Sequence, residues 1–148
     1  MAQKEFKLQQ VLNYREEIEK KCTREFSLAR EEYESACRRL EEEIQSVNLL
    51  AEEVQKLQRE GISATELQLY SDFFQRKRGD IQSHRQETEA LNETMAEKRE
   101  LLVEAAKDKK ALEILKAKKA LEFRREIADK ERLFLEEIAI RNNFHGKP

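Results

Sequence analysis

Proline, glycine and tryptophan are nearly absent from this chain of 148 residues. One proline ends the sequence, glycine occurs three times, and tryptophan does not occur. Three scattered glycines cannot build a phosphate-binding loop, and neither GxxxxGK nor GxGxxG is present. Because 41% of the residues are charged, the composition is typical of long helices or a coiled coil and not of a β-sandwich or an α/β enzyme. We therefore expect an all-α fold.

The chain also lacks a hydrophobic run long enough for a membrane span or a signal peptide, which predicts a cytoplasmic protein. The net charge is −2 and both signs are interspersed, so we expect no general attraction to nucleic acid or to an anionic membrane. The segment KDKKALEILKAKKALEFRR is basic. A basic zipper would place such a segment before the leucine repeat, whereas here it follows the repeat, so nucleic acid is not an expected partner.

Residues for metal or catalytic chemistry are equally scarce. Cys22 and Cys37 would lie about 22 Å apart on one helix, too far for a disulfide. Neither His84 nor His145 has ligand-spaced cysteines or carboxylates around it, and no serine has a histidine at an activating spacing. We expect no catalytic residue, metal, cofactor or small-molecule ligand. His84 is most simply a polar residue of a helix–helix interface.

Apolar residues recur at alternating spacings of three and four, which is the a/d pattern of a coiled coil. The first such stripe runs over residues 8–57 and has three polar members: Arg15, Glu19 and Glu43. A second, more polar stripe runs over residues 67–105 and keeps its spacing through Gly79. Since a helix of this length can absorb one interior glycine, we expect Gly79 to stay helical.

The stretch EGISATELQLYSDFF, residues 60–74, interrupts the pattern. Gly61 can adopt the left-handed conformation that ends a helix, and Ser63 followed by Glu66 forms a capping box for the next one. The sequence predicts helices over about 5–60 and 63–141, a turn at 61–62 and a flexible tail over 142–148. It favours an antiparallel two-helix coiled-coil hairpin with a longer second helix, in which the numbers of facing residues total about 123.

Aromatic residues follow this turn directly. In the expected register Tyr70 and Phe74 fall on the interface between the helices, whereas Phe73 falls beside it. Leu69 and Phe73 then share the outer face, because residues four apart on a helix are neighbours. An exposed apolar pair of this kind is a candidate binding surface.

The two arms of the expected hairpin differ in length. Phe6 would lie near residue 117, so the segment from there to Arg141 has no partner within the hairpin. The interface should also weaken before that point, because Arg15 and Glu19 fall opposite residues 104–108. Beyond it lies a new stripe: Ile114, Ala117, Leu121, Ala128, Leu135 and Ile138. Since an isolated helix is marginal in water, this apolar face predicts an external partner.

Five motifs point to one family: the opening FKLQQVLNYRE, GI followed by LQLYSDFFQ, HR at 84–85, KKALEILKAKK, and EEIAIR near the end. By these motifs the chain resembles, over essentially its whole length, FliJ, the stalk component of the flagellar type III export apparatus. The resemblance implies an antiparallel coiled coil similar to the central stalk subunit of rotary ATPases.

The resemblance also implies a function and partners. The protein would not be an enzyme. It would bind the hexameric flagellar export ATPase and promote its assembly and activity, contact the cytoplasmic domain of the export-gate membrane protein, and cycle export chaperones. It would be cytoplasmic and associate peripherally with the export apparatus of the inner membrane.

Two contact sites follow from the resemblance and the stripes together. The expected gate contact near the turn consists of Leu69, Phe73 and His84, although Lys77 and Asp80 stand where the family has two apolar positions. The expected ATPase-ring contacts lie toward the termini: Phe6, Leu8, Leu12, Ile114, Leu121, Leu135 and Ile138. Two alternatives remain open, namely the equivalent stalk of a virulence-type secretion system and a structural scaffold that forms a parallel homodimer.

Overall fold

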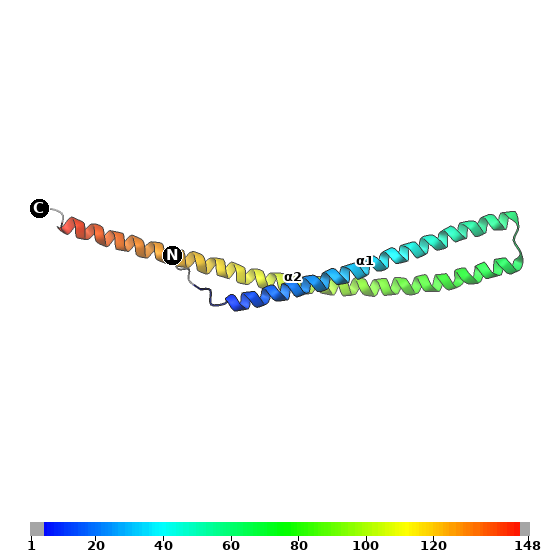
Figure 1. Cartoon of the computed structure of the whole chain (residues 1–148), viewed down its shortest axis with the longest axis horizontal. Helices are drawn as coiled ribbons and strands as arrows, with labels where there is room; N and C mark the ends of the chain where they lie inside the picture. The colour runs from blue at the N-terminus through cyan, green and yellow to red at the C-terminus, as the bar shows by residue number, and fades with distance from the viewer. Residues whose placement is uncertain (1–4, 146–148) are drawn as a thin grey trace. The chain divides into compact units, whose positions relative to one another are not determined.

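The computed structural model describes residues 5–145 and contains two α-helices in this range and no strand. Helix α1 spans Gln9–Glu60 and helix α2 spans Ala64–His145, with 52 and 82 residues. Figure 1 shows α1 in blue to cyan-green and α2 in green to red. The two helices pack against each other as an antiparallel hairpin, which confirms the predicted all-α fold and the longer second helix.

The outer ends of the helices differ slightly from the predicted bounds. Helix α1 begins at Gln9, after a turn in which the Gln9 amide donates to the Phe6 carbonyl at 3.0 Å. Helix α2 continues to His145, through part of the segment expected as a flexible tail, and the rest of that segment lies outside the described residues. No glycine or proline stands between Gly79 and Gly146, so nothing in the sequence forces an earlier end.

The turn between the helices forms as the sequence predicts. Gly61 has φ +104°, and its amide donates to the carbonyl of Leu57 at 2.9 Å, which is the left-handed motif that ends a helix. Helix α2 starts with the amide of Glu66 donating to Oγ of Ser63 at 3.2 Å. Ser63 thus caps the new helix by accepting a bond from one of the amides that have no partner within it.

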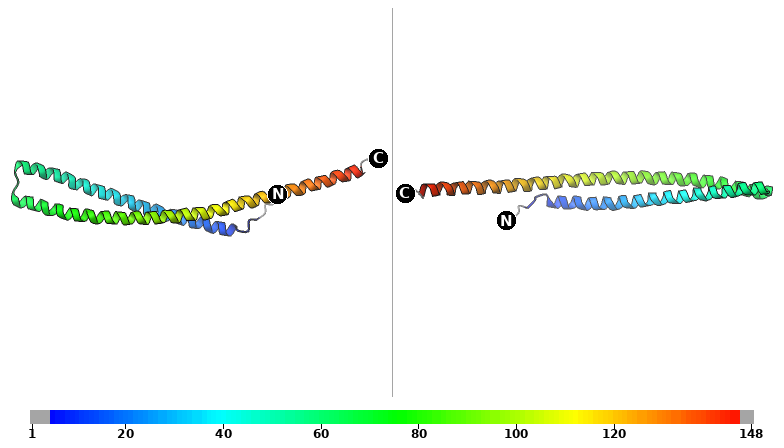
Figure 2. Two further views of the ribbon diagram at one scale, coloured as in Figure 1. Left: turned by 180° about the vertical axis from the view of Figure 1, so that it is seen from behind. Right: turned by 90° about the horizontal axis from the view of Figure 1, so that it is seen from above.

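The chain divides into two compact units, which are described separately. The turn-side unit consists of residues 21–103, and the terminal unit consists of residues 1–20 together with 104–148. The two arms of the turn-side unit lie side by side in both views of Figure 2. Its buried apolar residues are Ala29, Val54 and Met95, and those of the terminal unit are Leu12 and Ala105. The described residues thus form a narrow apolar interface and not a thick core.

Polar pairs fix the register of each unit. Lys98 Nζ lies 3.4 Å from a Glu25 carboxylate oxygen in the turn-side unit. Arg15 Nη1 lies 3.2 Å from Asp108 Oδ2 in the terminal unit. In both pairs the residue numbers total 123, the value predicted from the turn. The apolar stripes therefore pair within one chain, as a hairpin requires.

Candidate functional site

Near the turn, Phe73 and Phe74 lie against each other. Their ring centroids are 5.9 Å apart at an interplanar angle of 67°, an edge-to-face arrangement. Both side chains are half-buried, so the structure does not show the difference in burial that the sequence pattern predicts. Leu69 is 65% exposed. Of the two residues expected to form an outer patch, Leu69 is therefore the one that faces solvent freely.

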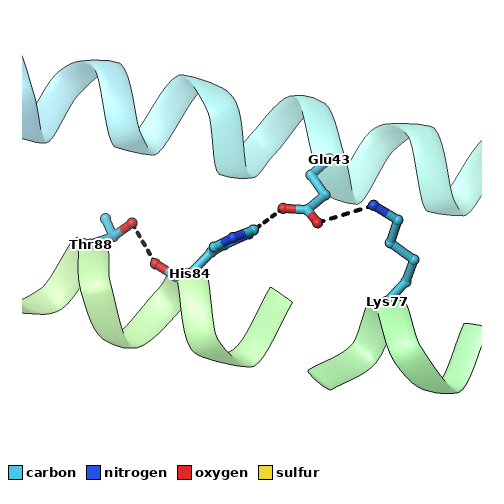
Figure 3. Close-up of polar contacts among 4 residues, drawn as sticks. All are labelled: Glu43, Lys77, His84 and Thr88. Carbon is cyan, nitrogen blue, oxygen red and sulfur yellow. Dashed lines mark hydrogen bonds and ion pairs between the residues drawn. The ribbon is translucent and has the colours of Figure 1, made fainter. Parts of the chain in front are cut away.

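Glu43 of α1 binds two residues of α2 (Figure 3). One of its carboxylate oxygens lies 2.6 Å from His84 Nδ1, and the other lies 3.5 Å from Lys77 Nζ. The Glu43 side chain is only 17% exposed. Thr88 continues this group by donating from Oγ1 to the His84 carbonyl at 2.8 Å. His84 is thus a polar residue at the helix–helix interface, and its ring is turned toward α1.

The neighbours of Glu43 lower the pKa of its carboxyl group below the ordinary value of 4.5. The hydrogen bond with His84 is the main cause. Partial burial of the carboxylate raises the pKa, whereas the charges of His84 and Lys77 lower it further. An ionised carboxylate can only accept, so His84 Nδ1 donates this bond. Lys77 also lies 5.9 Å from the centre of the Phe73 ring. Lys77 therefore has partners inside the hairpin.

The other two polar members of the first stripe also pair across the helices. Arg15 binds Asp108, and Lys109 Nζ lies 2.9 Å from Glu19 Oε2. The hydrogen bond to Glu19 is the main cause that raises the pKa of Lys109. Thus each polar position in the α1 stripe has an opposite charge facing it on α2. Polar pairs at such positions favour one register over others, because a shifted register would leave a charge without its partner.

The residues expected to contact an ATPase ring differ widely in exposure. Leu12 is only 3% exposed, so it packs inside the interface and offers almost no surface to a partner. Phe6 is half-buried. The remaining members are exposed, with exposed fractions of 37–64%: Leu8, Ile114, Leu121, Leu135 and Ile138.

The part of α2 from residue 120 to His145, here called the C-terminal extension, lies beyond the reach of α1. Arg15 pairs with Asp108 and Glu19 with Lys109, so Gln9, where α1 begins, falls opposite about residues 114–119. Every residue from 128 to 144 is exposed. Phe134 is 62% exposed and Phe144 is 85% exposed.

The sequence-based prediction did not include Phe134 among the contact residues, because it was based on a different stripe of apolar residues. Ala120, Ile127 and Phe134 recur every seven residues, and this spacing could have identified them. Leu133, Ile140 and Phe144 were also missed, and they are 55%, 62% and 85% exposed. The extension therefore exposes large apolar side chains on several sides.

Residues 5–145 contain neither a candidate metal site nor a candidate membrane span. No group of three or more histidine, cysteine, aspartate or glutamate side chains in this range could hold a metal ion. No helix in the same range is long and apolar enough to cross a membrane.

A match to a protein-family model decides which family the chain belongs to. The family model described as the flagellar FliJ protein matches residues 3–147. The chain belongs to the FliJ family. Membership makes it a component of flagellar export and biogenesis. Comparison with curated proteins and with solved structures gives no match.

Proposed function

We propose that this chain acts as a stalk of the flagellar type III export apparatus. Its C-terminal extension binds the hexameric export ATPase and promotes ring assembly and activity, and its turn end contacts the export gate. One observation carries the proposal: every residue from 128 to 144 is exposed, although this stretch holds several large apolar side chains. Membership of the FliJ family supports the choice of partners.

The distribution of apolar residues favours an enclosing partner over a flat one. Leu133, Phe134 and Leu135 are consecutive, and successive residues of a helix point about 100° apart. A helix that is apolar on several sides is normally buried on several sides. Burial of each large apolar side chain is worth about 1.5–3 kcal/mol. A socket formed by a ring of subunits can cover all of these sides at once.

The turn end suits a smaller contact. Leu69 is 65% exposed, and His84, at 46%, lies at the edge of the interface. Phe73 is half-buried between Phe74 and Lys77, so it would support this surface more than project from it. In this proposal the gate docks on Leu69 and the neighbouring edge of α2. Export chaperones are further proposed partners, and the protein works without catalysis at the cytoplasmic face of the inner membrane.

A crossed pair of substitutions tests both contacts. Leu69 and Leu135 are exposed to nearly the same extent, at 65% and 64%, so replacing either with glutamate should leave the fold intact. We expect Leu135→Glu to weaken binding and stimulation of the purified export ATPase about tenfold, a loss of about 1.4 kcal/mol. Leu69→Glu should weaken binding to the cytoplasmic domain of the gate protein to a similar degree.

Each variant serves as the control for the other. Leu69→Glu should stimulate the ATPase as the unaltered chain does, and Leu135→Glu should keep its affinity for the gate domain. Stimulation unchanged by Leu135→Glu would place the ring contact elsewhere. Loss of both activities in both variants would show a general defect and not two separate contacts.

A shortened chain provides a second test of the ring contact. A chain that ends at residue 119 keeps the pairs of Arg15 with Asp108 and of Glu19 with Lys109, and it lacks the C-terminal extension. We expect it to fold as a hairpin, to bind the gate domain and to lose stimulation of the ATPase. Full stimulation by this chain would contradict the proposed role of the extension.

A further inference from the structure

The C-terminal extension and the residues just before it reverse their charge midway. Residues 116–125 contain five basic residues and one acidic residue, whereas residues 126–137 contain five acidic and two basic residues. A second copy lying antiparallel would place each block against the block of opposite sign. A parallel copy would place like charges together, which disfavours association. The charge order therefore suits one particular partner, namely the same segment running in the opposite direction.

The exposed apolar residues fit the same arrangement. Ala120, Ile127 and Phe134 recur at the seven-residue spacing of a two-stranded coiled coil, and Ile138 lies one turn after Phe134 on the same side. Phe134 is 62% exposed, Ile138 is 37% exposed and Ile127 is half-exposed. A two-fold axis through Ile127 would place Ala120 of one copy opposite Phe134 of the other. A small residue then faces a large one, which allows close packing.

The charges beside this stripe share the same axis. Lys119 and Glu137 are eighteen residues apart, which is five full turns, so they lie on the same side of the helix. Arg124 and Glu131 lie together near the opposite edge of the stripe. In an antiparallel pair, residues at the same edge face each other, so Lys119 would meet Glu137 and Arg124 would meet Glu131 of the other copy. Lys119 now lies 3.6 Å from Glu122 of its own helix, an exposed contact that contributes little to stability.

From these features we infer that the C-terminal extensions of two copies pair antiparallel about a two-fold axis near Ile127. Such a contact is isologous and closes at a dimer. It is also short, so the dimer dissociates readily. The inference goes beyond the proposed function, because it concerns the chain in the absence of the ATPase. The ATPase ring and a second copy would cover the same surface around Phe134, so they cannot bind it at the same time. The dimer therefore covers this surface until the ATPase displaces the second copy.

Sedimentation equilibrium with two matched substitutions, one on the stripe and one away from it, tests the pairing. We expect the average mass of the full chain to rise from 17.6 kDa toward twice this value as the concentration increases. Phe134→Asp should keep the chain at the monomer mass. Ile140→Asp is the matched control, because Ile140 is as exposed as Phe134 (62%) but lies about 140° around the helix from Ile127, and it should associate like the unaltered chain. Helix content by circular dichroism checks that both variants fold.

Two results of this experiment would overturn the inference. One is a monomer mass at every concentration of the unaltered chain. The other is an equal effect of the two substitutions, which would indicate nonspecific association of the extension and not pairing through a defined face.

Exchanging the charges of Lys119 and Glu137 tests whether these two residues pair across the dimer. Lys119→Glu and Glu137→Lys should each weaken the dimer about tenfold, and the chain with both changes should recover most of the loss because the pair is restored with reversed sign. No recovery in the double variant would contradict the pairing of these two residues.

Disulfide formation tests the direction of the two chains. In a chain with Cys22→Ser and Cys37→Ser, one preparation carries Lys119→Cys and the other carries Glu137→Cys. An antiparallel dimer predicts disulfides between the two preparations after mixing and few within either one. Disulfides that form mainly within each preparation would show a parallel dimer and overturn the inference.

Discussion

The helix–helix interface and the C-terminal extension have similar apolar spacing but opposite exposure. In the interface Leu12 is 3% exposed and Val54 is 6% exposed, whereas in the extension Phe134 and Leu135 are 62% and 64% exposed. The cause is the length of the neighbouring helix, since α1 has 52 residues and α2 has 82. Spacing thus indicates that a face needs a partner, and the lengths of the two arms decide whether that partner is in the same chain.

Charged residues differ between the two regions in the same way. At the interface, charges at stripe positions are paired one by one across the helices, as Glu43 is with Lys77 and His84. In the extension and the residues just before it, charges are grouped into a basic block and an acidic block. The first arrangement fixes the register of a hairpin that is already formed. The second suits a partner that arrives from outside the chain.

The largest expected contrast between the regions is in stability. Leu12→Ala removes a side chain that is 3% exposed and should lower the free energy of unfolding by about 2–3 kcal/mol. Leu135→Ala removes one that is 64% exposed and should change it by less than about 0.5 kcal/mol. Urea unfolding followed by circular dichroism measures both. Equal losses would mean that the extension is packed in the free chain.

The next contrast lies within the turn-side unit and concerns Phe73 and Phe74. Both rings are half-buried and lie edge to face, so Phe73→Ala and Phe74→Ala should each cost about 1.5–2 kcal/mol, less than a fully buried phenylalanine. Urea unfolding of the two variants tests this equality. A loss for Phe74→Ala more than twice that for Phe73→Ala would support the division expected from the spacing alone.

The two glycines of the hairpin should respond to alanine with opposite signs. Gly61 has φ +104°, which an alanine tolerates poorly, so Gly61→Ala should cost about 1 kcal/mol or more. Gly79 lies inside α2, and an added Cβ there meets nothing within 4 Å. Gly79→Ala should therefore raise stability by about 1 kcal/mol. Thermal unfolding of both variants checks the signs, and destabilisation by Gly79→Ala would show that the helix needs a weak point there.

The smallest expected effect is the pH dependence that comes from Glu43. Its pKa in the folded chain is lower than the ordinary value of 4.5, mainly because of the bond from His84. The folded state therefore binds the proton less readily than the unfolded state does. This contribution to stability is present above pH 4.5 and is lost as the pH falls through the folded pKa.

Unfolding temperatures between about pH 7 and pH 3 test this contribution. Glu43→Gln should lower the unfolding temperature near neutral pH, and its difference from the unaltered chain should shrink in acid. Glu42→Gln is the control, since Glu42 is the exposed neighbour of Glu43 and should change little. A difference for Glu43→Gln that persists in acid would contradict a charge-based role.

Much of the fold could be predicted because it depends on local chemistry. Gly61, Ser63 and Glu66 define the turn by their backbone and capping preferences, and the turn then sets the register that pairs Arg15 with Asp108. Features that depend on three-dimensional packing could not be predicted in the same way. Spacing assigned different burial to Phe73 and Phe74, but adjacent residues at a two-helix interface can both reach its edge.

The candidate contacts were less predictable for the same reason. Leu12 follows the apolar spacing as Leu121 does, but only the structure shows that Leu12 is buried and that Leu121 is 44% exposed. Glu43 was noted only as an exception to a stripe, and its two partners on α2 emerge once the helices are placed together. The spacing of Ala120, Ile127 and Phe134 was present in the sequence, although a competing stripe concealed it.

Hydrogen exchange tests most directly whether the C-terminal extension lacks a partner in its own chain. The measurement compares amides 128–144 with those of the interface, at a concentration low enough to keep the chain monomeric. We predict rapid exchange over 128–144, slow exchange around Val54 and Met95, and slowing over 128–144 when the export ATPase is added. Equally slow exchange in both regions of the free monomer would contradict the account.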